Sequence, residues 1–175
     1  AEDGIRDKLV TGVQTCALPI YWILEADEVA ECIAAALKLG GRFVAEFGGA
    51  GNIEQIRAGL HVALDEIGRP EAKEWNLKYF PGEAEYAELL ARHGLRVERS
   101  WHFARPTKLE DGERGLRGWY EVFEKVTLDR LSADEREAVL AAVERHQRPH
   151  LHRDTPEGPH WIADYVRLRV VARRA

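Results

Sequence analysis

The stretch LKLGGRFVAEFGGAGN, residues 37–52, decides the fold class. The residues before it carry apolar side chains at helical spacing, and the paired glycines Gly40-Gly41 suit the left-handed end of a helix. RFVAEF, residues 42–47, then reads as a short buried strand with β-branched and aromatic side chains. GGAGN follows as a turn, in which Asn52 is expected to cap the next helix. A helix, a glycine stop and a buried strand make half of a βαβ unit, so the sequence predicts an α/β fold.

The same order recurs later in the chain. In residues 82–103 a helical pattern ends at Gly94, and a strand is expected from Leu95 to Phe103. Residues 161–174 alternate apolar and polar side chains, which predicts one long final strand. The chain therefore holds three candidate strands that flank two helix-rich regions.

Between the second and third candidate strands the pattern is helical. Apolar spacing predicts helices over residues 116–126 and 132–147. Ser132 is followed three residues later by Glu135, which is the capping-box pattern of a helix start. Residues 148–160 contain three prolines and read as a loop.

Composition narrows the class of protein. Of the 175 residues, 45% are apolar and 31% are charged, which is typical of a globular chain rather than a disordered one. The net charge is -5 and no Lys/Arg block stands out, so a nucleic-acid partner is not favoured. No apolar run has the length of a membrane span, and no signal peptide is recognisable. Two cysteines in unlike contexts argue against a disulfide framework and favour a reducing, cytoplasmic location.

The first twenty residues differ in style from the rest. AEDGIRD (1–7) and VTGVQTCALPI (10–20) can be back-translated into two consecutive parts of a common sequencing adapter, with Lys8-Leu9 in the place of its index. We interpret residues 1–20 as adapter-derived, which fits a metagenomic origin, and exclude them from fold reasoning. The alternative is a genuine N-terminal strand. On the adapter interpretation, the native part is residues 21–175 and its own N-terminus is expected to lie upstream.

Five blocks in chain order resemble one enzyme family, the class I S-adenosylmethionine-dependent methyltransferases. LKLGGRFVAEF is similar to the family's fifth-strand region, although Leu39 stands where proline is usual. YFPGEAEYAELLARHGLRVERS, RPTKLEDGERGLRGWYEVF and WIADYVRLRVVARR resemble the sixth-strand segment, an inserted helix and the closing strand. YWILEAD resembles the segment after the fourth strand, with Tyr21 in place of the usual histidine. The subgroup with the greatest resemblance is related to trans-aconitate methyltransferase.

This resemblance implies a Rossmann-like sheet that is mostly parallel, with an antiparallel last strand. The chain would hold its C-terminal part, namely strands five, six and seven with their flanking helices. The N-terminal strands, with the glycine-rich turn and the acidic residue that hold the cofactor in the family, would be missing; this part is about 100 residues long. The resemblance further implies methyl transfer from S-adenosylmethionine to a small-molecule acceptor by the parent protein, with the fragment itself inactive. GGAGN would then be the turn after the fifth strand rather than the cofactor loop.

The candidate site residues follow from this resemblance and from their positions. Trp22 is the candidate for cofactor binding, with a core or lid role as the alternative. For the acceptor we expect residues at the end of the strand 42–47 and aromatic residues beyond it, against the alternatives of strand packing, sheet cover and ordinary helix core. These candidates are Glu46, Gly48, Gly49, Trp75, Tyr79, Phe80 and Trp119, with Phe123 as a further lid residue. No catalytic residue is singled out, because displacement at a sulfonium carbon depends chiefly on alignment.

Histidines and cysteines offer little further chemistry. His146, His150, His152 and His160 cluster around residues 148–160, but no ligand spacing supports a metal, so a solvated loop is expected. Cys32 is expected to be a small buried apolar residue.

A second hypothesis is a non-catalytic α/β binding or dimerisation domain. The two hypotheses differ in the DNA upstream of Tyr21, where only the first requires a strand with a glycine-rich turn. Without a neighbouring strand the segment 42–47 has a bare edge, which we expect residues 10–20 to occupy. The chain as given is expected not to bind S-adenosylmethionine.

Overall fold

The computed structural model describes residues 13–15, 24–156 and 158–175. The chain forms two compact units, each built from segments that are far apart in the sequence. The first unit contains the described residues up to 50 together with 78–103 and 166–175, and the second contains 51–77 and 104–165. Among the described residues, no helix is long and apolar enough to cross a membrane.

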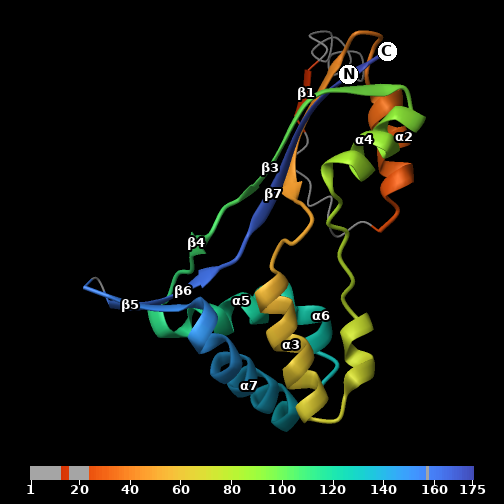
Figure 1. Ribbon diagram of the computed structural model, residues 1–175. Coiled ribbons are helices and arrows are strands. Elements are labelled where there is room, and N and C mark those ends of the chain that lie inside the picture. The colour runs from red at the N-terminus through yellow and green to blue at the C-terminus, as the bar shows by residue number, and fades with distance from the viewer. Residues whose placement is uncertain (1–12, 16–23, 157) are drawn as a thin grey trace, which may run out of the picture. The chain divides into compact units, whose positions relative to one another are not determined.

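The first unit is a sheet with two helices (Figure 1). Its strands form one sheet in the order β1-β2-β7-β3. Its elements are β1 (Val13–Thr15), α2 (Ala26–Ala36), β2 (Arg42–Gly48), α4 (Glu83–Arg92), β3 (Leu95–Ala104) and β7 (Val166–Arg174).

Strand directions in this sheet fit the expected part of a Rossmann-like domain. β7 pairs antiparallel with β2 over the whole length of β2, from Arg42 opposite Arg173 to Gly48 opposite Arg167. At the other side of β7, the Ala175 N–H donates to the Gly94 carbonyl, so the end of β7 lies beside the start of β3. β7 is therefore antiparallel to both neighbours, and β2 and β3 run parallel to each other with their carboxyl ends at the same edge.

One face of the sheet forms the core of the first unit. Along β2, Phe43, Ala45 and Phe47 are buried in a single cluster with residues of α2 and α4. The ring of Phe47 meets that of Tyr86 edge to face, with centroids 4.8 Å apart. Each fully buried phenylalanine contributes about 1.5–3 kcal/mol from the area removed from water. Period-two burial of a central strand thus fixes which face of β2 carries the helices.

The outer edge of β2 is occupied. Val13–Thr15 of β1 pairs in parallel with residues 42–44 of β2. The expectation that the segment 10–20 occupies this edge is confirmed for those three residues. The rest of that segment lies outside the described residues.

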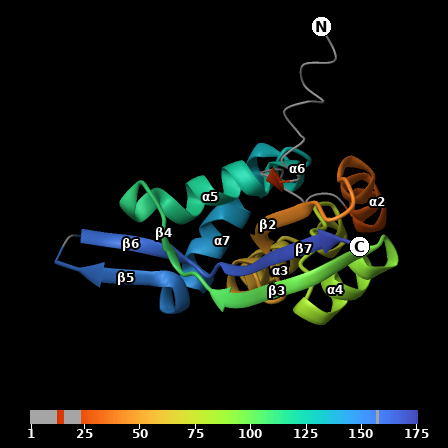
Figure 2. The same ribbon diagram turned by 90° about the horizontal axis from the view of Figure 1, so that it is seen from above.

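The second unit is helical with a small antiparallel sheet in the order β4-β6-β5 (Figure 2). In both views α3 and α7 lie side by side. Its elements are α3 (Glu54–Glu66), η3 (Pro70–Glu74), β4 (Thr107–Lys108), η4 (Gly112–Arg114), α5 (Gly115–Phe123), α6 (Lys125–Leu128), α7 (Ala133–Leu151), β5 (His152–Thr155) and β6 (Gly158–Ala163).

Close contact between α3 and α7 depends on a glycine. A Cβ atom at Gly59 would lie 2.4 Å from Nε2 and 2.7 Å from Cγ of Gln147, whose side chain is buried at the same crossing. The hydroxyl of the buried Tyr120 ties α5 to α3 by donating to the Ile56 carbonyl at 2.6 Å. This unit therefore has its own packed interior.

Two expectations about the last third of the chain are wrong. Residues 148–160 are not a loop, because α7 continues to Leu151 and β5 and β6 then pair antiparallel. The expected single strand over 161–174 is divided between two sheets, with the break at Asp164-Tyr165. There the Asp164 carbonyl accepts from Ile53 and its carboxylate accepts from Gln55, which hydrogen-bonds this break to the start of α3.

The helix starts give one confirmed and one wrong prediction. Ser132 accepts from the Glu135 N–H and the Glu135 carboxylate accepts from the Ser132 N–H, so the capping box of α7 is confirmed. Asn52 does not cap α3. The residue before this helix is Ile53, which has a left-handed backbone (φ 52°) and offers no side-chain acceptor, and Asp164 takes over that role.

Candidate functional site

The edge where β2 and β3 end is the natural position for a ligand in the first unit. In open α/β sheets, ligands bind outside the carboxyl ends of the parallel strands. β2 ends at Gly48, and the turn beyond it is fixed by two backbone hydrogen bonds. The Gly49 N–H donates to the Val166 carbonyl at 3.1 Å, and the Ala50 N–H donates to the Pro81 carbonyl at 3.0 Å.

Packing alone is sufficient to require a glycine at position 49. A Cβ atom at this position would lie 2.9 Å from Cδ2 of His102 and 3.0 Å from the Cβ of Leu168. Neither Gly48 nor Gly49 has a positive φ. Because the N–H groups of Gly49 and Ala50 are already used, this turn cannot cradle a cofactor with them as a glycine-rich loop does. The structure supports the interpretation of GGAGN as a strand-to-helix turn.

Glu46 lies on the face of β2 opposite the helices. Its carboxylate accepts from Nε of Arg169 at 2.8 Å, and its second oxygen lies 3.5 Å from Nε of Arg167. Glu46 and Arg169 are also directly opposite each other in the β2–β7 pairing. A cross-strand ion pair of this kind explains Glu46 without an acceptor molecule.

The aromatic candidates of the connecting segment are divided between the units. Trp75 belongs to the second unit, where the guanidinium groups of Arg69 and Arg130 lie 5.5 and 5.4 Å from its ring centroid. Tyr79 and Phe80 belong to the first unit and are both half-buried. Tyr79 packs against the core of that unit.

The phenol of Tyr79 has a perturbed acidity. Burial, followed by the nearby Glu85 carboxylate, raises the pKa of Tyr79 above its ordinary value. The hydroxyl therefore stays protonated at neutral pH, so it can donate a hydrogen bond but is a poor base.

Trp119 is a core residue of the second unit. It is 6% exposed, its Nε1 donates to the Tyr165 hydroxyl at 2.7 Å, and its ring contacts those of Tyr120 and Phe123. Phe123 is half-buried beside it. These contacts favour the core alternative over the lid role for Trp119. Trp22, the cofactor candidate, lies outside the described residues.

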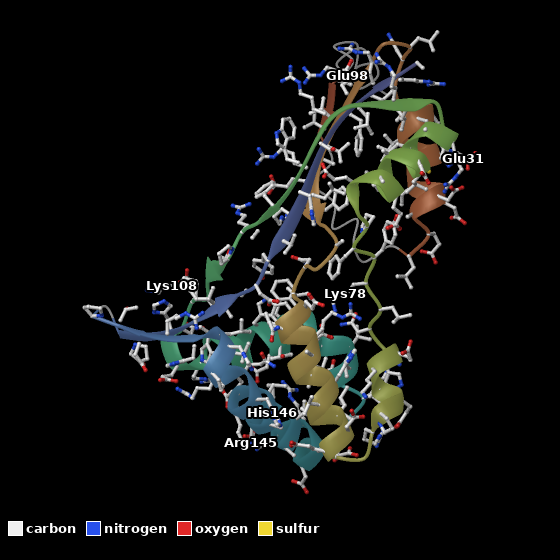
Figure 3. All side chains as sticks on the ribbon, in the orientation of Figure 1. Glu31, Lys78, Glu98, Lys108, Arg145 and His146 are labelled. Carbon is white, nitrogen blue, oxygen red and sulfur yellow. The ribbon has the colours of Figure 1, made fainter. Side chains whose placement is uncertain are left out.

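The histidine segment is not a solvated loop. His152 and His160 are buried, while His146 pairs with Glu66 of α3 at 2.6 Å, beside the Arg145–Glu66 pair (Figure 3). Cys32, expected to be buried, is exposed on α2. The helical pattern around Cys32 was correct but its buried position was not, and the loop predicted for the histidine segment is wrong.

One group of side chains has the composition of a metal site. Donor atoms of Glu113, His152 and Asp154 lie within 4.8 Å of one another. However, Glu113 faces Nε2 of His152 at 3.2 Å and Asp154 faces Nδ1 at 3.8 Å, so the two carboxylates meet opposite ring nitrogens. The guanidinium of Arg148 already contacts both Glu113, at 2.8 Å, and His152, at 3.2 Å. Because Arg148 already neutralises Glu113 and contacts His152, we regard this group as an ion-pair network.

A surface hollow lies at the start of α5 in the second unit. It is lined by Asp111, Arg114, Gly118 and Glu121. The sequence predicted none of these four residues as a site. Their mixed charges and exposure identify no ligand class.

Sequence reasoning missed His102, which the structure places at the end of β3 beside Gly49. Its Nε2 lies 2.9 Å from the carbonyl oxygen of Ala50, and its side chain is exposed. An imidazole near the predicted carboxyl end of a strand was the available signal. Its contact with the other strand end depends on pairing between distant segments, so spacing could not reveal it.

Comparison with known proteins supports the fold class. No protein-family model matches the chain. It is 26% identical over 164 residues to an uncharacterised methyltransferase of Schizosaccharomyces pombe, and the match covers 89% of this chain and 59% of the relative. The chain thus spans less than two thirds of the length of this curated relative.

Two solved structures show the same architecture. A protein described as a methyltransferase from Bacillus halodurans matches with a TM-score of 0.54 at 8% identity, over 93% of this chain and 64% of that one. A loganic acid methyltransferase with bound S-adenosylhomocysteine matches with a TM-score of 0.57 at 14% identity, over 93% and 53%. At these identities the likeness shows the fold alone: a part of a Rossmann-like methyltransferase domain.

Proposed function

We propose that this chain is the acceptor-side portion of a methyltransferase that transfers a methyl group from S-adenosylmethionine to a small molecule. The observation that carries the proposal is the three-strand arrangement of β2, β7 and β3. Its architecture is similar to that of the loganic acid methyltransferase solved with S-adenosylhomocysteine. The sequence relative is also named as a methyltransferase. The subgroup related to trans-aconitate methyltransferase remains our proposal from the sequence blocks.

Two backbone donors and one carboxylate near the end of β2 are already engaged within the chain. The backbone donors of the turn after β2 are taken by Val166 and Pro81, and Glu46 is neutralised by arginines of β7. The chemistry that S-adenosylmethionine supplies is an electrophilic methyl group on a sulfonium. What this chain contributes is the surface at the carboxyl ends of β2 and β3, where an acceptor would be oriented and shielded from water.

Calorimetry tests whether this chain alone binds the cofactor. S-adenosylmethionine titrated into the chain is expected to give no binding heat. Micromolar affinity would show that the described residues do hold the cofactor and that our view of the site is wrong.

Gene sequence and activity test the function itself. The native DNA upstream of the codon for Tyr21 is expected to encode a strand with a glycine-rich turn and a later acidic residue. A protein that carries this upstream part should transfer label from S-adenosylmethionine with a radioactive methyl group to a small acceptor. An open reading frame that starts just before Tyr21, or a native protein that transfers no label to any acceptor, would instead favour a binding or dimerisation domain.

A further inference from the structure

His102 lies at this strand edge, is exposed, and takes part in none of the ion pairs described above. Gly49 leaves room for its ring, because any side chain there would collide with Cδ2 and Nε2 at 2.9 and 3.2 Å. The imidazole therefore lies directly against the backbone of the turn that follows β2. It comes from β3, whose carboxyl end shares an edge with that of β2.

The hydrogen bond at His102 fixes its tautomer. A carbonyl oxygen can only accept, so the 2.9 Å contact to Ala50 requires that Nε2 carries the proton. In the neutral ring, Nδ1 then has a lone pair. No other hydrogen bond to this imidazole is formed within the described part of the chain. An exposed nitrogen base held in one tautomer by a backbone carbonyl is the arrangement required of a general base.

Two charged groups on the neighbouring elements are already engaged. Glu83 of α4 accepts from the Ser100 hydroxyl at 2.6 Å, two residues before His102 on β3. Arg169 of β7 pairs with Glu46, and its guanidinium lies 5.5 Å from the centroid of the Phe103 ring. Neither group therefore needs His102 as its partner.

We propose that His102 is the general base for the acceptor, and that the acceptor is a hydroxyl or amine compound rather than a carboxylate. This inference rests on the proposed function. As the acceptor oxygen or nitrogen forms its bond to the methyl carbon, the carbon–sulfur bond breaks and its electron pair stays on sulfur. The proton of the acceptor passes to Nδ1 of His102. A carboxylate acceptor is already ionised and would have no use for this nitrogen.

The first test needs no activity. Long-range ¹H–¹⁵N spectra of the imidazoles in this chain at pH 8 are expected to show His102 in the Nε2–H tautomer, with Nδ1 unprotonated. His150, an exposed histidine of α7, gives the reference for an unconstrained ring in the same spectrum. His102→Gln assigns the signal, and the glutamine amide can still donate to Ala50. A predominant Nδ1–H form, or tautomer populations equal to those of His150, would overturn the proposal.

The second test uses the protein with its native upstream residues. For a hydroxyl or amine acceptor, His102→Gln should lower kcat by about 10²–10⁴-fold, leave KM near its original value and abolish the rise of kcat with pH. His150→Gln is the matched control and should change neither constant. If methyl transfer occurs and His102→Gln retains the full rate, this inference fails while the proposed function stands. If no acceptor is methylated, both fail.

Discussion

The contact between Gly59 and Gln147 permits a quantitative test of the second unit. Replacement of Gly59 by alanine would place a methyl carbon 2.4–2.8 Å from three atoms of Gln147. Carbon atoms in protein interiors are normally about 3.5–4.0 Å apart, so one helix or the glutamine must move. Gln147 is only 4% exposed, which leaves it no free path to solvent.

The expected change in the free energy of unfolding is a balance of two effects. Overpacking of an interior costs about 1–3 kcal/mol. Removal of a glycine from a helix interior contributes about 1 kcal/mol in the opposite direction. We therefore expect Gly59→Ala to lower the free energy of unfolding by up to about 2 kcal/mol. In a Gln147→Ala background the collision is absent, and the same substitution should raise stability by about 1 kcal/mol.

Urea denaturation of the four proteins in this cycle measures the coupling between the two positions. Its expected size is about 1–3 kcal/mol. Gly118→Ala is the control, because a Cβ there would meet nothing within 4 Å on α5. This change should stabilise the protein by up to about 1 kcal/mol. An equal effect of Gly59→Ala in both backgrounds would refute the argument that Gln147 requires this glycine.

Three further predictions concern acidity, the strand edge and the turn after β2. Arg148 lowers the pKa of Glu113 below 4.5, so this pair should stabilise the fold above about pH 4.5 and lose its effect as the pH falls through the lowered value, with a weaker acid dependence in Glu113→Gln. A melting curve that is unchanged by this substitution at every pH would contradict the ion-pair network. Removal of residues 1–20 should expose the edge of β2 and increase concentration-dependent light scattering, and equal scattering by both proteins would contradict a role for β1. Gly49→Ala should displace His102, shift its imidazole resonances and destabilise the protein by about 1–3 kcal/mol, whereas unchanged resonances would contradict the close contact.

Local signals were sufficient where the stabilising partner lies nearby in sequence. The capping box of α7 joins residues only three apart, and both of its hydrogen bonds are present as expected. The strand predicted over residues 42–47 is likewise present as β2, because β-branched and aromatic side chains favour an extended backbone within a single segment. Such features follow from the backbone geometry of one element.

Sequence reasoning failed where the interacting residue lies far away in the sequence. α3 is capped not by Asn52 but by Asp164, which is 109 positions from its partner Gln55. The same interaction accompanies the break between β6 and β7, which an alternating pattern over 161–174 could not reveal. His102 became a candidate only because β7 brings the ends of β2 and β3 to one edge. Local patterns contain none of these pairings, since they arise from the tertiary fold.

The two glycine pairs of residues 37–52 show how a glycine-rich motif can be tested. Gly40 has a positive φ of 75° and donates to the Arg174 carbonyl, so it belongs to the turn before β2. It does not end the helix as predicted, because α2 already ends at Ala36 with an extended residue, Leu37, after it. Gly49 has no such backbone requirement, yet a Cβ there would strike His102 and Leu168. The N–H groups of Gly40, Gly41 and Gly49 all donate to carbonyls of the chain. The conformation, the neighbours of a notional Cβ and the partner of each N–H therefore separate a structural glycine from one that holds a cofactor. By these three criteria Gly49 is a structural glycine, and its missing side chain is what lets the His102 ring lie against this turn.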